Sequence, residues 1–363
     1  MIKEKKAMER NQLEEIVKPL TEWYRKNSRS LPWRKDRNPY RVWVSEIMLQ
    51  QTRVETVIPY FERFMKRFPD VASLAESDDE ELFKLWEGLG YYSRAANLKK
   101  AARTICARHQ GKFPETYEEI IGLPGIGPYT SGAISSIAFE QSRAAVDGNV
   151  LRVMTRLTEN GQDITDAGFR SQVTKQLEQI YPPQGKGDFT QSLMELGAVI
   201  CVPNGEPRCG ECPLAFFCRA YHNGTQLRYP VKKKKAPRKV EQKTVLILRV
   251  QDIEDRIAIR KRDAGGVLAG MWELPNLNGI LNEQEVLQWL SDKHITVKAM
   301  SGEIDQKKQM KHIFTHIEWH MAYWIVDCDA VGEGNGLTWV TAWQLENEIA
   351  LPTAFKKVYK KIP

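Results

Sequence analysis

Long hydrophobic runs are missing from this sequence of 363 residues, and none reaches the roughly 18 apolar residues that a helix needs to cross a bilayer. The first residues, MIKEKKAMERNQLEE, carry charges of both signs and are not followed by the apolar segment of a secretory signal. These absences argue against a membrane protein and against a secreted one. We expect a soluble, intracellular chain, and its 42% hydrophobic residues are enough for packed cores.

Cysteine is also scarce. The six residues present are too few for a disulfide framework in a chain of this size. Four of them, Cys201, Cys209, Cys212 and Cys218, fall within eighteen residues, which predicts a shared metal centre. A zinc knuckle usually pairs two C-x-x-C units, whereas here one such pair is flanked by single cysteines at unequal spacing. This asymmetry favours an iron-sulfur cubane. Zinc and ordinary buried cysteines are the alternatives.

Alternating apolar and polar residues, which are typical of strands, are nearly absent from the first 220 residues or so. Apolar residues recur there at three- and four-residue spacing instead. This spacing predicts helices that include residues 42–52, 79–86, 95–108, 130–138 and 168–180. We therefore predict an all-α unit for this part of the chain.

The composition changes after this unit. Residues 231–239, VKKKKAPRK, hold six basic residues and a proline, which indicates a charged linker more than a dedicated DNA-binding arm. Beyond it, a short helix is predicted at 283–290 and strands at 244–250, 257–261 and 320–326. Since the chain is too long for one ordinary core, we predict a multidomain protein with a helical domain at 1–230, a basic linker at 231–240 and a smaller α+β domain at 241–363.

The formal net charge of +7 suits a polyanionic partner, although charge alone is weak evidence. A more specific indication is Leu123-Pro124-Gly125-Ile126-Gly127-Pro128-Tyr129-Thr130, which lies between two helical segments. Two glycines around an apolar residue form a tight turn whose free backbone N–H groups can face a phosphate at a helix N-terminus. This is the helix-hairpin-helix signature. A plain turn between helices is the alternative.

Two carboxyl groups are candidates for catalysis. Asp147, in Val146-Asp147-Gly148-Asn149, opens a helix about twenty residues after the hairpin, where it could also serve only as an N-cap. Glu46 lies in an otherwise apolar and aromatic helical segment, where burial would raise its pKa and keep it protonated. A surface or salt-bridged Glu is the alternative. One protonated and one ionised carboxyl are the minimal equipment for breaking a glycosidic bond.

These motifs resemble those of the DNA glycosylase superfamily that includes endonuclease III. Tyr129 occupies the hairpin position at which lyase members carry a lysine, so the resemblance implies base removal without efficient strand cleavage. The resemblance covers nearly the whole chain. Four further matches are typical of the MutY branch, which removes adenine: LPWR at 31–34, SEIMLQQT at 45–52, GLGYYSRA at 88–95 and AVDGNV at 145–150.

The resemblance implies an enzyme that hydrolyses the N-glycosidic bond of adenine mispaired with 8-oxoguanine or guanine, after flipping the adenine out of duplex DNA. Glu46 would protonate the base, Asp147 would stabilise the oxocarbenium ion, and Tyr129 and Asn149 would support the pocket and the second carboxylate. Contacts with DNA or the lesion, including a wedge formed around Tyr91, are implied for twelve positions: Arg29, Leu31, Arg34, Leu49, Gln51, Thr52, Leu89, Tyr91, Gly125, Gly127, Thr315 and His316.

For the cysteine group the resemblance implies one 4Fe-4S cluster. Seven residues separate Cys201 from Cys209, one more than is common in the family, and a loop absorbs such an insertion at little cost. The resemblance further implies that the helical domain combines a six-helix barrel module with an iron-sulfur cluster module. It also implies a monomer that acts on double-stranded DNA in the bacterial cytoplasm, at the nucleoid.

Residues 266–275, GVLAGMWELP, resemble the early strand and loop of the Nudix-like domain that MutY proteins carry. No R-E-x-x-E-E helix follows, so the carboxylates that bind magnesium in Nudix hydrolases are missing. The implied role of this domain is lesion recognition. Phe314-Thr315-His316 corresponds to the loop that contacts oxidised guanine, with threonine where relatives often have serine.

Three other functions are weighed against adenine removal. A glycosylase-lyase that acts on oxidised pyrimidines is opposed by Tyr129 and by the second domain. A non-catalytic iron-sulfur module that only binds DNA is opposed by the pair of Glu46 and Asp147. A nucleotide hydrolase driven by the second domain is opposed by the missing Nudix helix.

Overall fold

The computed structural model describes residues 10–233, 236–331 and 335–361. Its contacts form two compact units, one made of Met1–Glu76 and Asn97–Lys234 and the other of Ser77–Ala96 and Lys235–Pro363. The boundary between the units at 234/235 lies within the basic segment predicted as a linker. Residues 234 and 235 are outside the described part of the chain, as are the charged residues 1–9. The boundaries at 230 and 240 stay a prediction.

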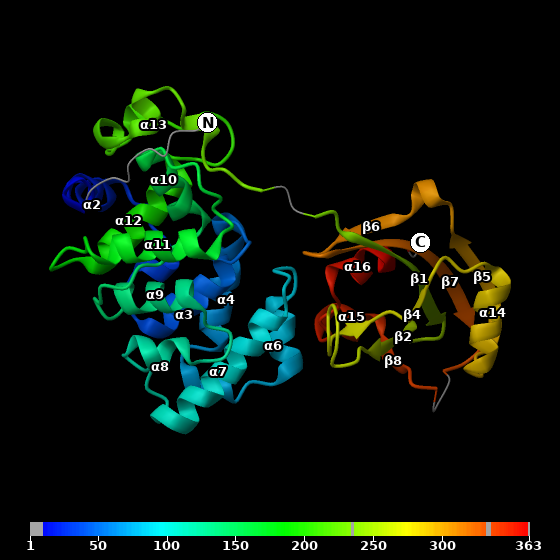
Figure 1. Cartoon of the computed structure of the whole chain (residues 1–363). Helices are drawn as coiled ribbons and strands as arrows, with labels where there is room; N and C mark the ends of the chain where they lie inside the picture. Colours follow the sequence, from blue (N-terminus) through cyan, green and yellow to red (C-terminus); the bar gives the residue numbers. More distant parts are fainter. Residues whose placement is uncertain (1–9, 234–235, 332–334, 362–363) are drawn as a thin grey trace. The chain divides into compact units, whose positions relative to one another are not determined.

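The first unit is helical, which confirms the predicted all-α domain (Figure 1). Its short 3-10 turns are η1 (Pro32–Arg34), η2 (Cys209–Glu211), η3 (Ala215–Phe217) and η4 (Gln226–Arg228). Its helices are α1 (Arg10–Glu14), α2 (Val17–Asn27), α3 (Pro39–Leu49), α4 (Val54–Arg67), α5 (Val71–Ala75), most of α7 (Ser93–His109), α8 (Tyr117–Ile121), α9 (Pro128–Ile137), α10 (Gly148–Thr158), α11 (Ala167–Glu178), α12 (Lys186–Val199) and α13 (Arg219–His222).

The core of this unit joins segments that are far apart in sequence. Leu13, Ile16 and Leu20, from α1, α2 and the turn between them, are buried against α10, α11 and α12. In the other part of the unit α3 packs against α4 and α9, and α9 packs against α12. Each fully buried aliphatic side chain stabilises the fold by about 1.5–3 kcal/mol. This packing brings α3, α9, α10 and α12 together, although in the sequence these helices extend from Pro39 to Val199.

Helix α3 begins and ends for local reasons. The Asn38 side chain accepts hydrogen bonds from the backbone N–H groups of Tyr40 and Arg41, and Pro39 occupies the first helical position. The helix ends at Leu49, three residues before the end of the predicted segment 42–52. The prediction was wrong there because Gln50 leaves the helical region, with ψ 112°, and Gln51 is left-handed, with φ 60°.

The predicted hairpin lies between α8 and α9. Gly125 has φ 76°, and a Cβ atom at this position would stand 2.5 Å from the Cβ of Asn97, so only glycine fits there without movement. Gly127 is the N-cap of α9, and Pro128 is its first residue. The two glycines therefore turn the chain tightly into the N-terminus of α9.

The second unit is α+β, as predicted. Strand β1 pairs in parallel with β7, and the other pairings of the mixed sheet are antiparallel. The helices are α6 (Asp79–Trp86), α14 (Glu283–Asp292), α15 (Ala342–Asn347) and α16 (Thr353–Tyr359), with the turn η5 (Gln306–Lys308). The strands are β1 (Lys239–Val250), β2 (Arg256–Lys261), β3 (Trp272–Glu273), β4 (Asn276–Asn278), β5 (Val297–Glu303), β6 (Met310–Ile313), β7 (Ile317–Cys328) and β8 (Thr338–Thr341).

Side chains of β1 alternate between two cores on the two faces of the sheet. Leu246 and Leu248 pack with α14, whereas Val245 and Ile247 pack with α16. Within this unit α6 is joined to the sheet by Glu80, which accepts hydrogen bonds from Lys261 Nζ at 3.1 Å and from Trp272 Nε1 at 2.8 Å. Segment 77–96 therefore belongs to the second unit, although it interrupts the first in sequence.

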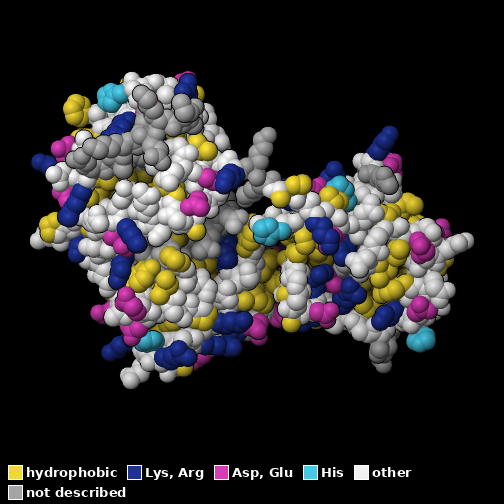
Figure 2. All heavy atoms as spheres, viewed as in Figure 1, with side chains coloured by type: hydrophobic (Ala, Val, Ile, Leu, Met, Phe, Trp, Pro, Cys, Tyr) yellow, Lys and Arg dark blue, Asp and Glu magenta, His cyan; other side chains and the backbone are white. Residues whose placement is uncertain are grey.

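Every helix in the described part of the chain is too short or too polar to cross a membrane. On the face seen in Figure 2, Lys and Arg side chains lie on both units and are interspersed with Asp and Glu. In the sequence as a whole, the excess positive charge belongs to the first unit, whereas acidic residues slightly outnumber basic ones in the second.

Candidate active site and cysteine cluster

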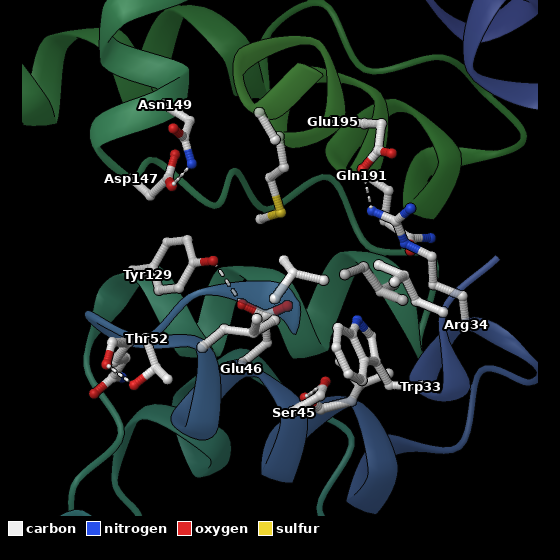
Figure 3. Close-up of a pocket in the computed structure, with 18 of the residues that line it drawn as sticks. Trp33, Arg34, Ser45, Glu46, Thr52, Tyr129, Asp147, Asn149, Gln191 and Glu195 are labelled. Atoms are coloured by element: carbon white, nitrogen blue, oxygen red, sulfur yellow. Dashed lines mark hydrogen bonds and ion pairs between the residues drawn. The ribbon is translucent and has the colours of Figure 1, made fainter. Parts of the chain in front are cut away.

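A pocket of about 520 Å³ opens into the first unit, a size within the range of small-molecule sites (Figure 3). Its walls come from η1, α3, α9, α10 and α12. It contains all four residues predicted as catalytic: Glu46, Tyr129, Asp147 and Asn149. The core packing of the unit thus brings the two predicted carboxyl groups into one cavity.

Glu46 projects from α3 into this pocket and is only 6% exposed, so it is not a surface residue. Burial raises its pKa to about 7 against the opposing effect of a hydrogen bond from Tyr129, and the Asp147 charge raises it further. The neighbouring Arg34 lowers it. Glu46 is therefore largely protonated below neutrality, as the apolar segment predicts.

The phenol of Tyr129 fixes the direction of this carboxyl group. Its hydroxyl donates to Glu46 Oε2 at 2.5 Å (Figure 3). Burial and the Glu46 charge raise the pKa of Tyr129 well above its usual value, so the phenol stays a donor. Because Oε2 accepts, the proton of the neutral carboxyl group lies on Oε1.

Asp147 is the N-cap of α10 and at the same time a pocket residue. Its Oδ1 accepts from the Val150 backbone N–H and its Oδ2 from Asn149 Nδ2, both at 2.8 Å. Burial raises the pKa of Asp147, and these hydrogen bonds together with the Arg152 charge oppose that rise. Since both oxygens accept hydrogen bonds, the arrangement favours the ionised form.

Asn149 is held by a chain of hydrogen bonds that leads to the cysteine group. Its Oδ1 accepts from Arg152 Nη2 at 2.9 Å, and Arg152 Nε donates to the Cys201 carbonyl at 2.7 Å. Arg156, one turn further along α10, donates from Nη1 to Cys201 Sγ at 3.2 Å. Helix α10 therefore connects the pocket with the loop that carries the cysteines.

The four clustered cysteines line one small cavity together with Arg156. Nevertheless, the structure places no three His, Cys, Asp or Glu side chains of the described residues so that they could hold a single metal ion. Four thiols around one cavity fit an iron-sulfur cluster, and a structural zinc is bound by the same kind of ligand.

The other predicted contact residues are divided between the units. Thr315 and His316 lie in the turn between β6 and β7, and the Thr315 hydroxyl is 3.4 Å from that of Tyr91. Tyr91 is 44% exposed, whereas Leu89 is buried. These four residues belong to the second unit, while in the first unit the pocket wall contains Arg29, Leu31, Arg34, Leu49, Gln51 and Thr52.

Several pocket residues were not predicted, among them Trp33, Gln191 and Glu195. Glu195 lies in the apolar stretch LMELGAV of α12, the same kind of surroundings that singled out Glu46. That signal was present in the sequence. Trp33 lies between Leu31 and Arg34 in the LPWR motif, so a signal for it was also present, whereas the contact of Gln191 with the pocket arises from tertiary packing and has no local pattern.

The fold of the first unit matches that of base excision repair proteins. Residues 44–183 match the model of the HhH-GPD superfamily of base excision DNA repair proteins, and residues 244–361 match the NUDIX domain. A solved structure entitled a thermostable thymine-DNA glycosylase superposes with a TM-score of 0.53 at 27% identity, covering 59% of this chain and 98% of that one.

Similarity to one family extends over most of the chain. The adenine DNA glycosylase of Rattus norvegicus is 33% identical over 94% of this chain and 76% of its own length. That of Buchnera aphidicola (subsp. Baizongia pistaciae) is 34% identical over 94% of both. The chain therefore belongs to the adenine DNA glycosylase family.

Proposed function

We propose that this enzyme removes adenine mispaired with 8-oxoguanine, or with guanine, from duplex DNA and leaves an abasic site. The observation that carries the proposal is that one pocket contains both a protonated Glu46 and an Asp147 whose two accepted hydrogen bonds favour its ionised form. These are the two protonation states that glycosidic bond cleavage needs. The pocket is also large enough for a flipped base.

In the proposed reaction Glu46 gives the proton on Oε1 to N7 of the flipped adenine. The N-glycosidic bond then breaks with its electron pair moving to the base, and positive charge develops on the sugar. The Asp147 carboxylate stabilises this oxocarbenium ion until water adds to it and gives up a proton, which the Glu46 carboxylate can take back. Tyr129 keeps Glu46 aimed at the base, and Asn149 keeps Asp147 aimed at the sugar.

Tyr129 also supports a monofunctional enzyme. A lyase needs an amine to form a Schiff base with the sugar, and the hairpin position is filled by a phenol with a strongly raised pKa that is already bonded to Glu46. Abasic sites should therefore persist after the base has left.

The test is a single-turnover assay on duplexes with adenine opposite 8-oxoguanine, with each sample split and analysed with and without alkali. Strand breaks that appear only after alkali are expected. Breaks without alkali would overturn the monofunctional assignment, and intact strands in both samples would overturn the proposed excision. A duplex with thymine opposite 8-oxoguanine serves as the substrate control.

We further propose that the second unit supplies recognition of the oxidised guanine through Thr315 and His316, with Tyr91 as the wedge in the base stack. The exposed ring of Tyr91 and the nearby Thr315 hydroxyl support this assignment. A hydroxyl can donate to and accept from a base edge. Gln51, Thr52 and Leu89 would contribute the remaining contacts around the lesion, and Gly125 and Gly127 would present backbone N–H groups to a phosphate.

The pH dependence of excision follows from Glu46. Because burial raises its pKa to about 7 and the acid form is the active one, the single-turnover rate should rise as the pH falls towards 6, until protonation of Asp147, whose pKa burial also raises, lowers it again. It should fall about tenfold per unit above about pH 8. Rates measured from acid to alkaline pH, with duplex binding measured in parallel as the control, check this prediction. A rate that rises between about pH 6 and pH 8 would assign the opposite role to Glu46.

We propose that the four clustered cysteines bind one 4Fe-4S cluster that holds their loop in shape. Purified protein should contain about four irons and four sulfides and absorb near 400 nm. The Cys212→Ser variant should lose most of this absorbance, whereas Cys106→Ser, in α7 and outside the cavity, should keep it. One zinc per chain and no such absorbance would contradict the proposal.

A further inference from the structure

Arg94 is a buried charged residue that the proposed reaction does not use. It is the second residue of α7 and is only 9% exposed. Burial lowers the pKa of Arg94 to about 10, so its guanidinium remains charged at neutral pH. A cation in the first turn of a helix faces the positive end of the helix dipole, and the burial of its charge is also unfavourable. The position of Arg94 is therefore unfavourable for α7 itself, and contacts outside the helix must offset this.

The Arg94 side chain reaches back to the loop that precedes α7. Its Nη2 donates to the backbone carbonyls of Leu89 and Gly90, both at 3.1 Å. The Gly90 carbonyl also accepts from Trp86 Nε1 at 3.1 Å. The guanidinium carbon lies 5.3 Å from the centre of the Trp86 ring and 5.5 Å from that of the Tyr91 ring, distances at which a cation attracts an aromatic ring. Arg94 therefore contacts both the backbone of the loop and the ring of Tyr91.

The loop itself has an unusual backbone. Gly88, Gly90 and Tyr91 all have positive φ, of 101°, 70° and 50°. Glycine adopts such angles readily, whereas tyrosine rarely does, so the conformation at Tyr91 needs support from its surroundings. Because Tyr91 is 44% exposed, packing in a core does not supply all of this support. The hydrogen bonds from Arg94 to the two carbonyls just before Tyr91 contribute to it.

We propose that Arg94 is a positioning residue, which sets the loop and the ring of Tyr91 in place before DNA binds. The wedge then enters the base stack beside the oxidised guanine without reordering of the loop. A loop that is already ordered loses less conformational entropy on binding, so the affinity for the mispaired duplex is higher. This inference rests on the proposed function, in which Tyr91 is the wedge. A purely structural Arg94 would stabilise the fold and leave the wedge unaffected.

The experiment compares Arg94→Met with Arg103→Met in the full-length protein that also carries Glu46→Gln, which slows excision during the binding measurement. Arg103 is a matched control because it also lies on α7 and its Nε donates to a backbone carbonyl, that of Ala75 at 3.1 Å, outside the loop at 88–91. The duplex has adenine opposite 8-oxoguanine, with 2-aminopurine as the next base on the 8-oxoguanine strand. The fluorescence of 2-aminopurine changes when a side chain enters the stack beside it.

This change in fluorescence should be about threefold smaller in Arg94→Met, and the duplex should bind about tenfold more weakly. Arg103→Met should alter each of these quantities by less than about twofold. A fluorescence change of normal size in folded Arg94→Met would overturn the inference.

A double-mutant cycle with Tyr91→Ala isolates the path of the effect. If Arg94 acts through the wedge, Arg94→Met should weaken binding about tenfold when Tyr91 is present but less than about twofold in the Tyr91→Ala background. Equal losses in the two backgrounds would show a purely structural role and overturn the inference. Arg94→Lys, which keeps the charge but lacks the planar fork, should weaken binding about threefold, again only with Tyr91 present. The same cycle with Arg94→Lys decides the question if Arg94→Met fails to fold.

Failure of this inference is distinguishable from failure of the proposed function. A wild-type protein that leaves adenine in place would refute the proposed excision. A wild-type protein that excises adenine but shows no fluorescence change that depends on Tyr91 would refute the wedge, and the role of Arg94 with it.

Discussion

Replacement of Glu46 by Gln should slow adenine excision by about 10³- to 10⁴-fold while the variant still binds the mispaired duplex. Gln retains an oxygen that can accept the Tyr129 hydroxyl, so the pocket and α3 should keep their shape. What is lost is the proton on Oε1 that the proposed reaction transfers to the base. Single-turnover rates and duplex affinity, measured side by side, check this result.

Glu62→Gln is a suitable control for that variant, because Glu62 is an exposed residue on α4 outside the pocket. Its rate should match that of the parent protein. If Glu46→Gln lost binding but kept its rate on bound substrate, Glu46 would be a contact residue for the base and the catalytic acid would lie elsewhere.

Asp147→Asn should be almost as damaging, with a loss of about 10²- to 10³-fold in the single-turnover rate. The reason is the loss of the negative charge that faces the developing oxocarbenium ion. Asn is as good an N-cap as Asp, so α10 should begin at the same residue and the melting temperature should change little. Circular dichroism with thermal melting, beside the excision assay, separates the two effects.

A combined test strengthens this assignment. Groups that act in one transition state give losses that are far from additive, so the variant that combines Glu46→Gln with Asp147→Asn should be little slower than the slower single variant. Losses that multiply fully would show that the two carboxyl groups act in separate steps. A melting temperature that falls sharply in Asp147→Asn alone would mean that capping accounts for its effect.

Much of the catalytic site was predictable because its chemistry leaves local traces in the sequence. A glutamate among apolar and aromatic neighbours indicates burial, and Glu46 is buried. Glycines on either side of an apolar residue indicate a tight turn, and Gly125 has the positive φ that such a turn needs. The helical and α+β units likewise follow from hydrophobic periodicity, since that periodicity decides which face of each element is buried.

Other features could not be predicted, because they depend on contacts between distant segments. The end of α3 at Leu49 depends on the backbone conformations of Gln50 and Gln51, and polar residues in a helical pattern give no sign of a left-handed turn. The four donors of Glu195 come from more than 160 residues away in sequence. The grouping of 77–96 with the second unit likewise rests on pairs such as Glu80 with Trp272.

That grouping limits how the protein can be dissected. The polypeptide passes from one unit to the other at 76/77, 96/97 and 234/235, so a single cut at the basic linker does not separate them. A chain stopped at residue 234 would keep α6 but lose Lys261, Trp272 and Lys356, which bind Glu80 and Glu87. Weak activity of such a fragment could therefore result from the disturbed α6 as well as from loss of the lesion-recognition domain. Single substitutions, in place of truncation, are needed to separate the roles of the two units.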